Sequence, residues 1–218
     1  MRFLRCARAE FLLVFPRLAR TRFGISLLAL CAALLWLGEQ GFDSLTVVLQ
    51  ASALGAIVGT AFLAGHEHDR PAILVALTHP TSSLAIATGR WMALFAPAAV
   101  LTVTACVATG RVDGLLPGLL TAAAVGGCTL GAVLLFGSAA AFALFICMAV
   151  AGSVPPERLV DLARPGVLRL TAASALELGP ALWHYRDIAH DLGAVLHAVA
   201  WTGLGILLSS AIVSRHKP

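Results

Sequence analysis

Charged side chains are scarce in this chain. Of its 218 residues only 12% are charged, whereas 59% are hydrophobic. Ordinary soluble domains carry about 25% charged residues. A chain with so little charge cannot cover a globular surface with solvated groups, so we expect an integral membrane protein.

Lysine is nearly absent, and this excludes one large class of enzymes. The sole lysine is Lys217, within "SRHKP", and no glycine-rich loop precedes it. A phosphate-binding loop requires a lysine directly after such a loop. The chain therefore cannot hydrolyse ATP by that mechanism, and we expect no enzyme activity and no cofactor.

Two other kinds of chemistry find little support in the sequence. Gly24-Ile25-Ser26 and Gly137-Ser138 do not form a nucleophile elbow, so an intramembrane serine hydrolase stays an open but weakly supported alternative. His197 is the only histidine well inside an apolar stretch. A haem held between two axial histidines within the bilayer is therefore not expected.

The five cysteines lack any CxxC spacing, and four of them lie in apolar stretches, so neither a disulfide framework nor a metal site is expected. A second candidate metal site consists of His184, Asp187, His190 and Asp191, because positions three and four apart share one helix face. We interpret these side chains as solvent-exposed residues that directly precede the apolar stretch 192–213. The neighbouring Trp183 and Tyr185 are then aromatic residues at the membrane interface. We therefore expect no metal.

Long apolar stretches make up most of the sequence. A helix needs about 17 to 25 apolar residues to cross a membrane. Six stretches are candidates, the first and the fifth at the lower limit: residues 23–37, 45–64, 91–109, 115–136, 138–154 and 192–213. We predict an all-α polytopic membrane protein with six transmembrane helices in a single domain.

The arginines predict the orientation of these helices. A signal peptide is the alternative for the N-terminus, but residues 1–22 are too rich in arginine and no cleavage site follows. With six spans, one side of the membrane holds ten bases and three acids, and the other holds five bases and eight acids. Positively charged segments stay in the cytoplasm, so we expect both termini there.

Two further segments are amphipathic. Residues 2–20 mix phenylalanine and leucine with five arginines, which is typical of a helix in the headgroup layer on anionic lipid, bending or ending at Pro16. The alternative is an elongated first span. Residues 155–191 are expected on the outer side as one or two short amphipathic helices.

Gly55-x-x-x-Gly59 and Gly127-x-x-x-Gly131 predict close helix packing, as do Gly203 and Gly205.

The stretch "GHEHDRPAILVALTHPTSS" interrupts the apolar pattern after the second span. Asp69 and Pro71 favour the start of a helix, and Pro80 favours its end about ten residues later. Thr81, Ser82 and Ser83 are suited to capping a new helix that continues into span three. The short helix either caps the bundle or docks on a soluble partner.

The order of these features resembles the membrane subunit of ABC exporters of the second export type (ABC-2-like). The likeness rests on an acid after span two, a base, a leucine-rich helix, a proline with hydroxyl residues, and Gly-Arg in span three. In this chain those features are Glu67, Arg70, "ILVAL", Pro80-Thr81-Ser82 and Gly89-Arg90. The six-span layout, the basic N-terminal helix and the large outer segment are also similar. The chain departs from the family at His66, His68, Pro71 and His79.

The resemblance implies a half-permease that works with a separate ABC ATPase subunit and a second permease subunit, identical or homologous. The segment 66–80 would be a coupling helix on the ATPase, and the turn at Gly137-Ser138 a minor second contact. The implied contact residues are Glu67, Asp69, Arg70, Ile73, Leu74, Leu77, Thr78 and Pro80.

The implied layout has an interfacial helix (1–22), spans one and two (23–64), a cytoplasmic coupling segment (65–90), spans three to five (91–154), an outer segment (155–191), and span six with its tail (192–218). We expect membrane lipids and no nucleic acid as partners, and the bacterial inner membrane as location. Two alternatives remain, a haem exporter B-type subunit and a non-transporting scaffold or accessory subunit.

Overall fold

The structure is a computed structural model that describes residues 2–20, 22–38, 44–67, 82–137, 139, 143, 174, 178–186 and 191–215. Within these ranges the fold is all α. The helices are α1 (Arg2–Arg20), α2 (Arg22–Gly38), α3 (Ser44–Glu67), α5 (Ser83–Thr109), α6 (Leu115–Phe136) and α10 (Leu192–Arg215). Two 3-10 turns accompany them, η1 (Val112–Gly114) and η3 (Leu182–Tyr185).

Four helices are long and apolar enough to cross a membrane. Their spanning segments are Leu45–Phe62, Ser83–Thr109, Val112–Phe136 and Leu192–Arg215. The apolar part of α2, Gly24–Trp36, is shorter than these. The predicted all-α, multi-pass character is therefore confirmed for the described residues, while the predicted fifth span lies almost entirely outside them.

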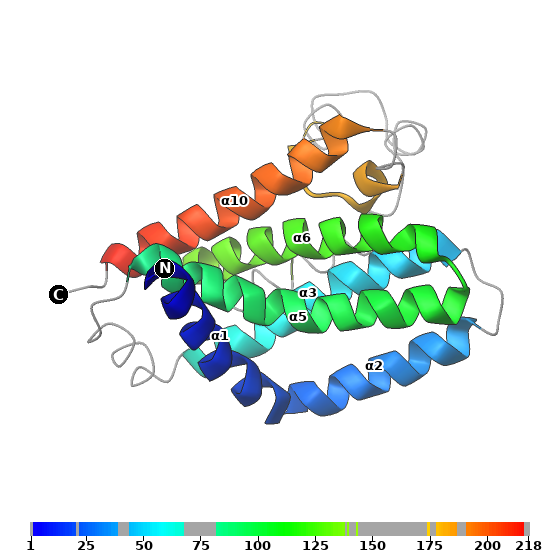
Figure 1. Cartoon of the computed structure of the whole chain (residues 1–218), viewed down its shortest axis with the longest axis horizontal. Helices are drawn as coiled ribbons and strands as arrows, with labels where there is room; N and C mark the ends of the chain where they lie inside the picture. The colour runs from blue at the N-terminus through cyan, green and yellow to red at the C-terminus, as the bar shows by residue number, and fades with distance from the viewer. Residues whose placement is uncertain are drawn as a thin grey trace.

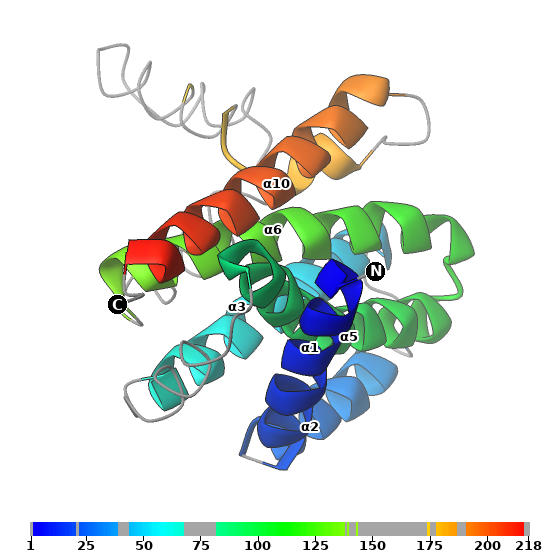
Figure 2. The same ribbon diagram turned by 60° about the vertical axis from the view of Figure 1, so that its left-hand side comes forward.

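The helices form a bundle in which sequence neighbours alternate in direction (Figure 1). α2 and α5 run one way, α3 and α6 the other, and α10 lies along α6 on the side away from α2 (Figures 1 and 2). α10 runs in the same direction as α6. The described chain thus begins and ends at one end of the bundle, which we call the terminal end.

The helix ends follow from local sequence. Ser82 has extended backbone angles, and its side chain accepts a hydrogen bond from the Ala85 amide, so the predicted cap of this helix is confirmed. At the other end Gly110 adopts a left-handed φ of 67°, and the Arg111 amide bonds back to the Cys106 carbonyl. Glycine adopts this conformation at little cost. α5 is therefore delimited at both ends by its sequence.

Small residues bring the helices of the core close together. A Cβ on Gly55 of α3 would lie 2.8 Å from the Cα of Ala98 in α5. Ala56, Ala98 and Ala124 are fully buried in the cluster that α3, α5 and α6 share. Because lipid tails are as apolar as leucine, close van der Waals packing of this kind is what holds membrane helices together.

The predicted glycine motif of α6 forms the contact with α10. A Cβ on Gly127 would lie 2.8 Å from the Cα of Thr202, and a Cβ on Gly205 would overlap the Gly127 carbonyl. Gly131 faces Leu208 of α10. A Cβ on Gly203, by contrast, would meet no described atom of another residue within 4 Å. Gly205 is thus the contact glycine of this helix, and Gly203 is not.

The helix boundaries can be compared with the prediction. α1 continues through Pro16 to Arg20, so of the two predicted effects of this proline, a bend or an end, the end is excluded. α3 extends to Glu67, beyond the predicted limit at residue 64. α5 begins at Ser83, in agreement with the predicted helix that passes Gly89 and Arg90 and continues as span three.

Candidate functional site

The predicted docking segment lies between α3 and α5. Glu67 is the last residue of α3, and Ser83 is the first of α5. Both lie at the terminal end of the bundle (Figure 1). The other predicted contact residues lie outside the described residues: Asp69, Arg70, Ile73, Leu74, Leu77, Thr78 and Pro80. The structure therefore describes the two helices that flank this segment, α3 and α5.

A buried ion pair joins the start of α5 to α1. The Arg90 Nε donates a hydrogen bond to the Glu10 Oε1 at 3.0 Å. The two side chains are only 7% and 11% exposed. An ion pair withdrawn from solvent in this way is little screened by salt. It fixes α1 on α5 at one defined position along the helix.

Gly89 allows this close approach. A Cβ on Gly89 would lie 2.5 Å from the Ala7 carbonyl oxygen and 2.6 Å from the Glu10 Cβ. Any larger residue would push α1 away from α5 and separate the ion pair. The Gly89-Arg90 pair thus acts as one contact, in which the glycine provides the space and the arginine the charge.

The apolar side of α1 packs on the bundle. Phe11, Val14 and Phe15 lie against a cluster that includes Leu94 of α5 and Leu130 of α6. The rings of Phe11 and Phe15 stack, with centroids 5.3 Å apart. The opposite side exposes Leu4, Arg5, Arg8, Leu12, Leu13 and Arg20. The predicted helix is confirmed, but its packed side faces protein, and a mixed basic and apolar side faces outward.

α10 contacts the same end of α5. The Ser210 hydroxyl lies 3.1 Å from that of Ser83 and donates a hydrogen bond to it. The first two turns of α5 are therefore bonded to α1 on one side and to α10 on another. These turns directly follow the predicted docking segment in the sequence.

Glu10 is not among the site residues that the sequence predicts. Glu10 and Arg90 are 80 positions apart, and no local pattern pairs residues at that distance. A signal nevertheless exists in α1, because Ala7, Glu10, Phe11 and Val14 follow the spacing of one buried helix face. A lone acid on such a face indicates a buried cationic partner.

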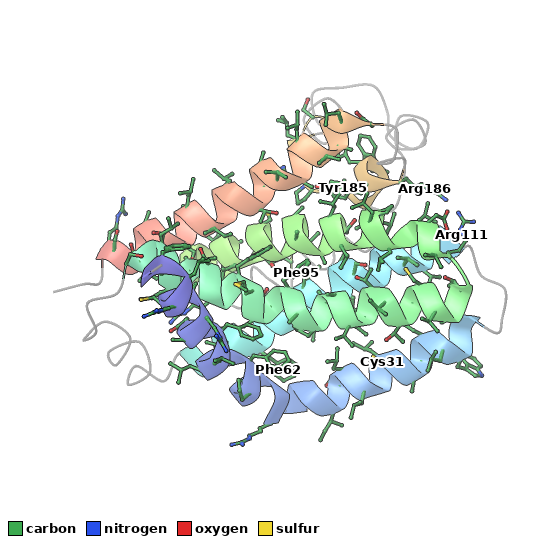
Figure 3. The ribbon with its side chains drawn as sticks, viewed as in Figure 1. Cys31, Phe62, Phe95, Arg111, Tyr185 and Arg186 are labelled. Carbon is green, nitrogen blue, oxygen red and sulfur yellow. The ribbon has the colours of Figure 1, made fainter. Side chains whose placement is uncertain are left out.

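A second polar cluster lies at the opposite end of the bundle, where η3 meets α10 (Figure 3). The Tyr185 hydroxyl is 3.1 Å from the His197 Nδ1. The carbonyl of Leu178 is 3.1 Å from the His197 Nε2 and accepts a 2.7 Å hydrogen bond from the Trp201 indole. Tyr185 is fully buried, and burial, with a smaller contribution from Cys128, raises its pKa.

The alternative metal site near this cluster is only partly described. His184 stacks on Trp183, with ring centroids 3.7 Å apart, and Asp191 accepts a hydrogen bond from the Gly193 amide. Asp187 and His190 lie outside the described residues. Among the residues that are described, no three potential metal ligands come together.

Buried hydroxyl pairs join the central helices. The Ser52 and Thr102 hydroxyls are 2.7 Å apart, between α3 and α5. Those of Thr60 and Thr129 are 3.0 Å apart, between α3 and α6. Each of these hydroxyls also lies within hydrogen-bond distance of a carbonyl in its own helix. Because a hydroxyl has one hydrogen, in each pair one hydroxyl donates to its partner while the other donates to its own carbonyl.

We predict a small effect when one such pair is removed. Thr102→Val together with Ser52→Ala is expected to lower the free energy of unfolding by about 1 kcal/mol, because interhelical hydrogen bonds within membranes average about 0.6 kcal/mol. Equilibrium unfolding in mixed micelles measures the change. A loss of more than about 3 kcal/mol would contradict this assignment.

The cysteines of the described part are free thiols: Cys6, Cys31, Cys106 and Cys128. The Thr104 hydroxyl donates to the Cys31 sulfur at 3.7 Å. Cys106 is buried within an apolar cluster. Cys106 thus lies in the core as a small apolar residue, as predicted, whereas Cys6, Cys31 and Cys128 are half-buried.

Comparison with known proteins leaves the family open: no protein-family model matches the chain, and no curated protein matches it.

Proposed function

We propose that this chain is the membrane subunit of an ABC exporter of the second export type. In this proposal it is a half-permease that a second, identical or homologous subunit completes. A separate ATPase subunit supplies the energy, because the chain has no phosphate-binding loop of its own.

The observation that carries the proposal is the contact between α1 and the start of α5. The resemblance includes a Gly-Arg pair at the beginning of span three, and here Gly89 admits α1 while Arg90 binds Glu10. This contact lies seven residues beyond Ser83, the first residue after the proposed docking segment that belongs to a helix. Any displacement of that segment would therefore move α5 and α1 together.

The Ser83–Ser210 hydrogen bond supports the same role. It joins the first residue of α5 to α10, which packs along α6 through Gly127 and Gly205. A push on the segment 66–80 would thus reach α1, α10 and the long core helix α5 at once. In our proposal, closure of the ATPase pair is transmitted to the membrane helices by this route.

The direction of the helices supports the six-span topology. α6 ends at the terminal end of the bundle, whereas η3 and the start of α10 lie at the opposite end (Figure 1). The chain between Gly137 and Leu178 has to connect those two ends, and residues 138–154 are apolar. With α2 as the first span, six spans would place both termini in the cytoplasm, in agreement with the distribution of arginine.

The buried interior favours a lipidic, amphipathic or peptide-like cargo. Apart from the Arg90–Glu10 ion pair, the buried polar side chains among the described residues carry hydroxyls: Ser52, Thr60, Thr102, Thr121, Thr129 and Ser209. Ion pathways within membranes are marked by ionisable residues. In our proposal the exported molecule therefore carries a substantial apolar part.

The exposed side of α1 suits the membrane surface on the cytoplasmic side. It presents Arg5, Arg8 and Arg20 beside Leu4 and Leu12. Arginine binds anionic headgroups while leucine enters the acyl boundary. In our proposal α1 rests on the inner leaflet and holds the start of α5 at that level.

We predict that Glu67→Arg and Leu74→Asp release the ATPase subunit. The first reverses a charge at the end of α3. The second places a charge among Ile73, Leu74 and Leu77, whose spacing predicts one apolar face of the short helix. The ATPase recovered in a pull-down in mild detergent, and its stimulation by the membrane subunit, are each expected to fall about tenfold or more, the equivalent of about 1.4 kcal/mol.

Asp113→Arg is the matched control for the charge reversal. Asp113 is an exposed acid at the opposite end of the bundle, where it pairs with Arg111. Recovery of the ATPase is expected to be unchanged in this variant. Full recovery and stimulation in both test variants, or a bound partner without nucleotide-binding motifs, would refute the exporter proposal.

A further inference from the structure

The exposed side of α1 carries positive charge that no acid of this helix balances. Arg5 and Arg8 are exposed and lie three positions apart, so they share one face. The only acidic residue of α1 is Glu10, and it is turned inward to Arg90, with its side chain only 11% exposed. Among the described residues, no acid forms an ion pair with Arg5 or Arg8. The buried ion pair thus leaves a face on which the described charges are all positive.

Exposed leucines lie beside these arginines. Leu4 and Leu12 are 71% and 54% exposed. Each lies four positions from Arg8, and residues four apart are neighbours on a helix surface. We call Leu4, Arg5, Arg8 and Leu12 the α1 patch. Its composition fits a molecule that combines an anionic group with apolar chains.

α1 lies at the depth where headgroups meet acyl chains. It runs across α5 rather than along it, near the terminal end of the bundle (Figures 1 and 2). α5 has 27 residues and is therefore about 40 Å long, about 10 Å longer than the hydrocarbon layer is thick. α1 meets α5 at Gly89, about 9 Å along the helix from Ser83, where α5 begins. With α5 as a membrane span, this contact lies near the edge of the hydrocarbon layer.

This depth and composition favour a phospholipid over other anionic molecules. A free phosphate would bind the arginines but would leave the leucines exposed to water. An acidic soluble protein would have to enter the headgroup layer to reach the patch. An anionic phospholipid satisfies both kinds of side chain, because arginine forms charge-assisted hydrogen bonds with phosphate and leucine enters the acyl boundary.

We propose that the α1 patch is a binding site for an anionic phospholipid, with Arg5 and Arg8 on the headgroup and Leu4 and Leu12 against the acyl chains. The inference deepens the proposed function, which places this side of α1 on the inner leaflet, by naming the class of lipid that binds there. The bound lipid and the Arg90–Glu10 ion pair then hold α1 from opposite sides. Only the choice of leaflet rests on the exporter topology, because the binding requires no ATPase.

Lipid binding to the purified full-length protein tests the proposal. The protein in a neutral detergent is titrated with dioleoylphosphatidylglycerol or with dioleoylphosphatidylcholine, and native mass spectrometry counts the bound lipids. Each arginine near an anionic headgroup contributes about fivefold in affinity. The wild-type protein is therefore expected to bind the anionic lipid about 25-fold more tightly than the zwitterionic one.

Substitution of the two arginines identifies the site. Arg5→Gln and Arg8→Gln are each expected to lower the preference for phosphatidylglycerol about fivefold, and the double variant is expected to lose it. Glutamine is a good helix former, and both positions are exposed, so α1 should remain folded. Arg111→Gln is the matched control. Arg111 is an exposed arginine at the opposite end of the bundle (Figure 3), but Asp113 already neutralises it, so the preference should change less than about twofold.

Three results would overturn the proposal. The first is equal affinity of the wild-type protein for the two lipids, and the second is an unchanged preference in the double variant. The third is displacement of the lipid by millimolar glycerol phosphate, which would identify the patch as a site for a soluble anion. If the double variant retained the preference but no longer recovered the ATPase, the patch would be a protein contact, and the lipid assignment would be wrong.

The wild-type protein provides a second test if the double variant does not fold. Raising the salt concentration from about 0.1 M to about 1 M shortens the screening length from about 10 Å to about 3 Å. The preference for phosphatidylglycerol is expected to fall several-fold, because it depends on charge. A preference that does not change with salt would overturn the role of the arginines. These measurements need no ATPase, so they can fail while the exporter proposal stands, and the reverse is also true.

Discussion

Replacing Arg90 with methionine is expected to lower the free energy of unfolding by about 3–5 kcal/mol, the usual effect of breaking a buried ion pair. Methionine preserves most of the apolar stem that packs between α1 and α5. What is lost is the guanidinium that binds Glu10, whose side chain is only 11% exposed. The carboxylate then remains in a poorly solvated contact, and α1 loosens from α5. Equilibrium unfolding in mixed micelles measures the change.

The chain offers a matched control at the other end of α5. Arg111 pairs with Asp113 at the same 3.0 Å, but those side chains are 44% and 67% exposed. Exposed pairs contribute about 0–1 kcal/mol. Arg111→Met is therefore expected to have little effect, although the substitution and the bond length are the same. Equal losses in the two variants would show that burial does not determine the strength of the α1 contact.

A second substitution tests whether the unpaired carboxylate is the cause. Adding Glu10→Gln to Arg90→Met removes the buried charge, so a large part of the lost stability should return. If the double variant is no more stable than Arg90→Met, lost packing around Arg90 explains the effect, and the ion pair does not fix α1.

The helices themselves were largely predictable. The sequence predicts α6 at residues 115–136, which are its observed limits, because a turn precedes it and Gly137 follows it. The start of α5 was also predictable from its hydroxyl residues, of which Ser82 forms the cap. Local signals of this kind specify where a helix begins and ends, whatever it later packs against.

Whether protein or lipid lies against a given helix face could not be predicted in the same way. The period of α1 shows which residues share a face, but a phenylalanine looks the same whether lipid or protein covers it. Phe11 and Phe15 pack on the protein cluster that includes Leu94 of α5, whereas the sequence predicts only a helix in the headgroup layer. Likewise, hydropathy places the start of span three at Trp91, because Arg90 interrupts the apolar run. The ion pair with Glu10 is what allows that arginine to lie inside the fold.

The candidate site was predictable only in part. The order of Glu67, Pro80 and Gly89-Arg90 was readable from sequence, and Gly89-Arg90 lies in a buried contact. Its partner on α1 was not readable, since it depends on how two helices cross. The cluster of Tyr185, His197 and Trp201 was missed for the same reason, because its hydrogen bonds form only when η3 is brought against α10.

Substituting alanine for Gly205 is expected to destabilise the protein by about 1–3 kcal/mol, the usual cost of overpacking. The added methyl group would overlap the carbonyl of Gly127, which belongs to the backbone of α6. A side chain could rotate away, but a backbone carbonyl cannot move unless the helix moves with it. α10 would therefore be displaced from α6, and because Ser210 contacts Ser83, the displacement would extend to the start of α5.

Gly203→Ala is the control for Gly205→Ala, because it separates the effect of overpacking from the effect of helix propensity. Gly203 lies two residues earlier on α10, and a methyl group there would have no described neighbour within 4 Å. Alanine favours a helix over glycine by about 1 kcal/mol, so this variant should be neutral or slightly stabilised. A small change in Gly203→Ala beside a loss in Gly205→Ala would establish that α10 is held by backbone contact with α6. Equal changes in both variants would mean that α10 adjusts its position freely, and the Ser83–Ser210 contact could then not carry movement from α5 to α10.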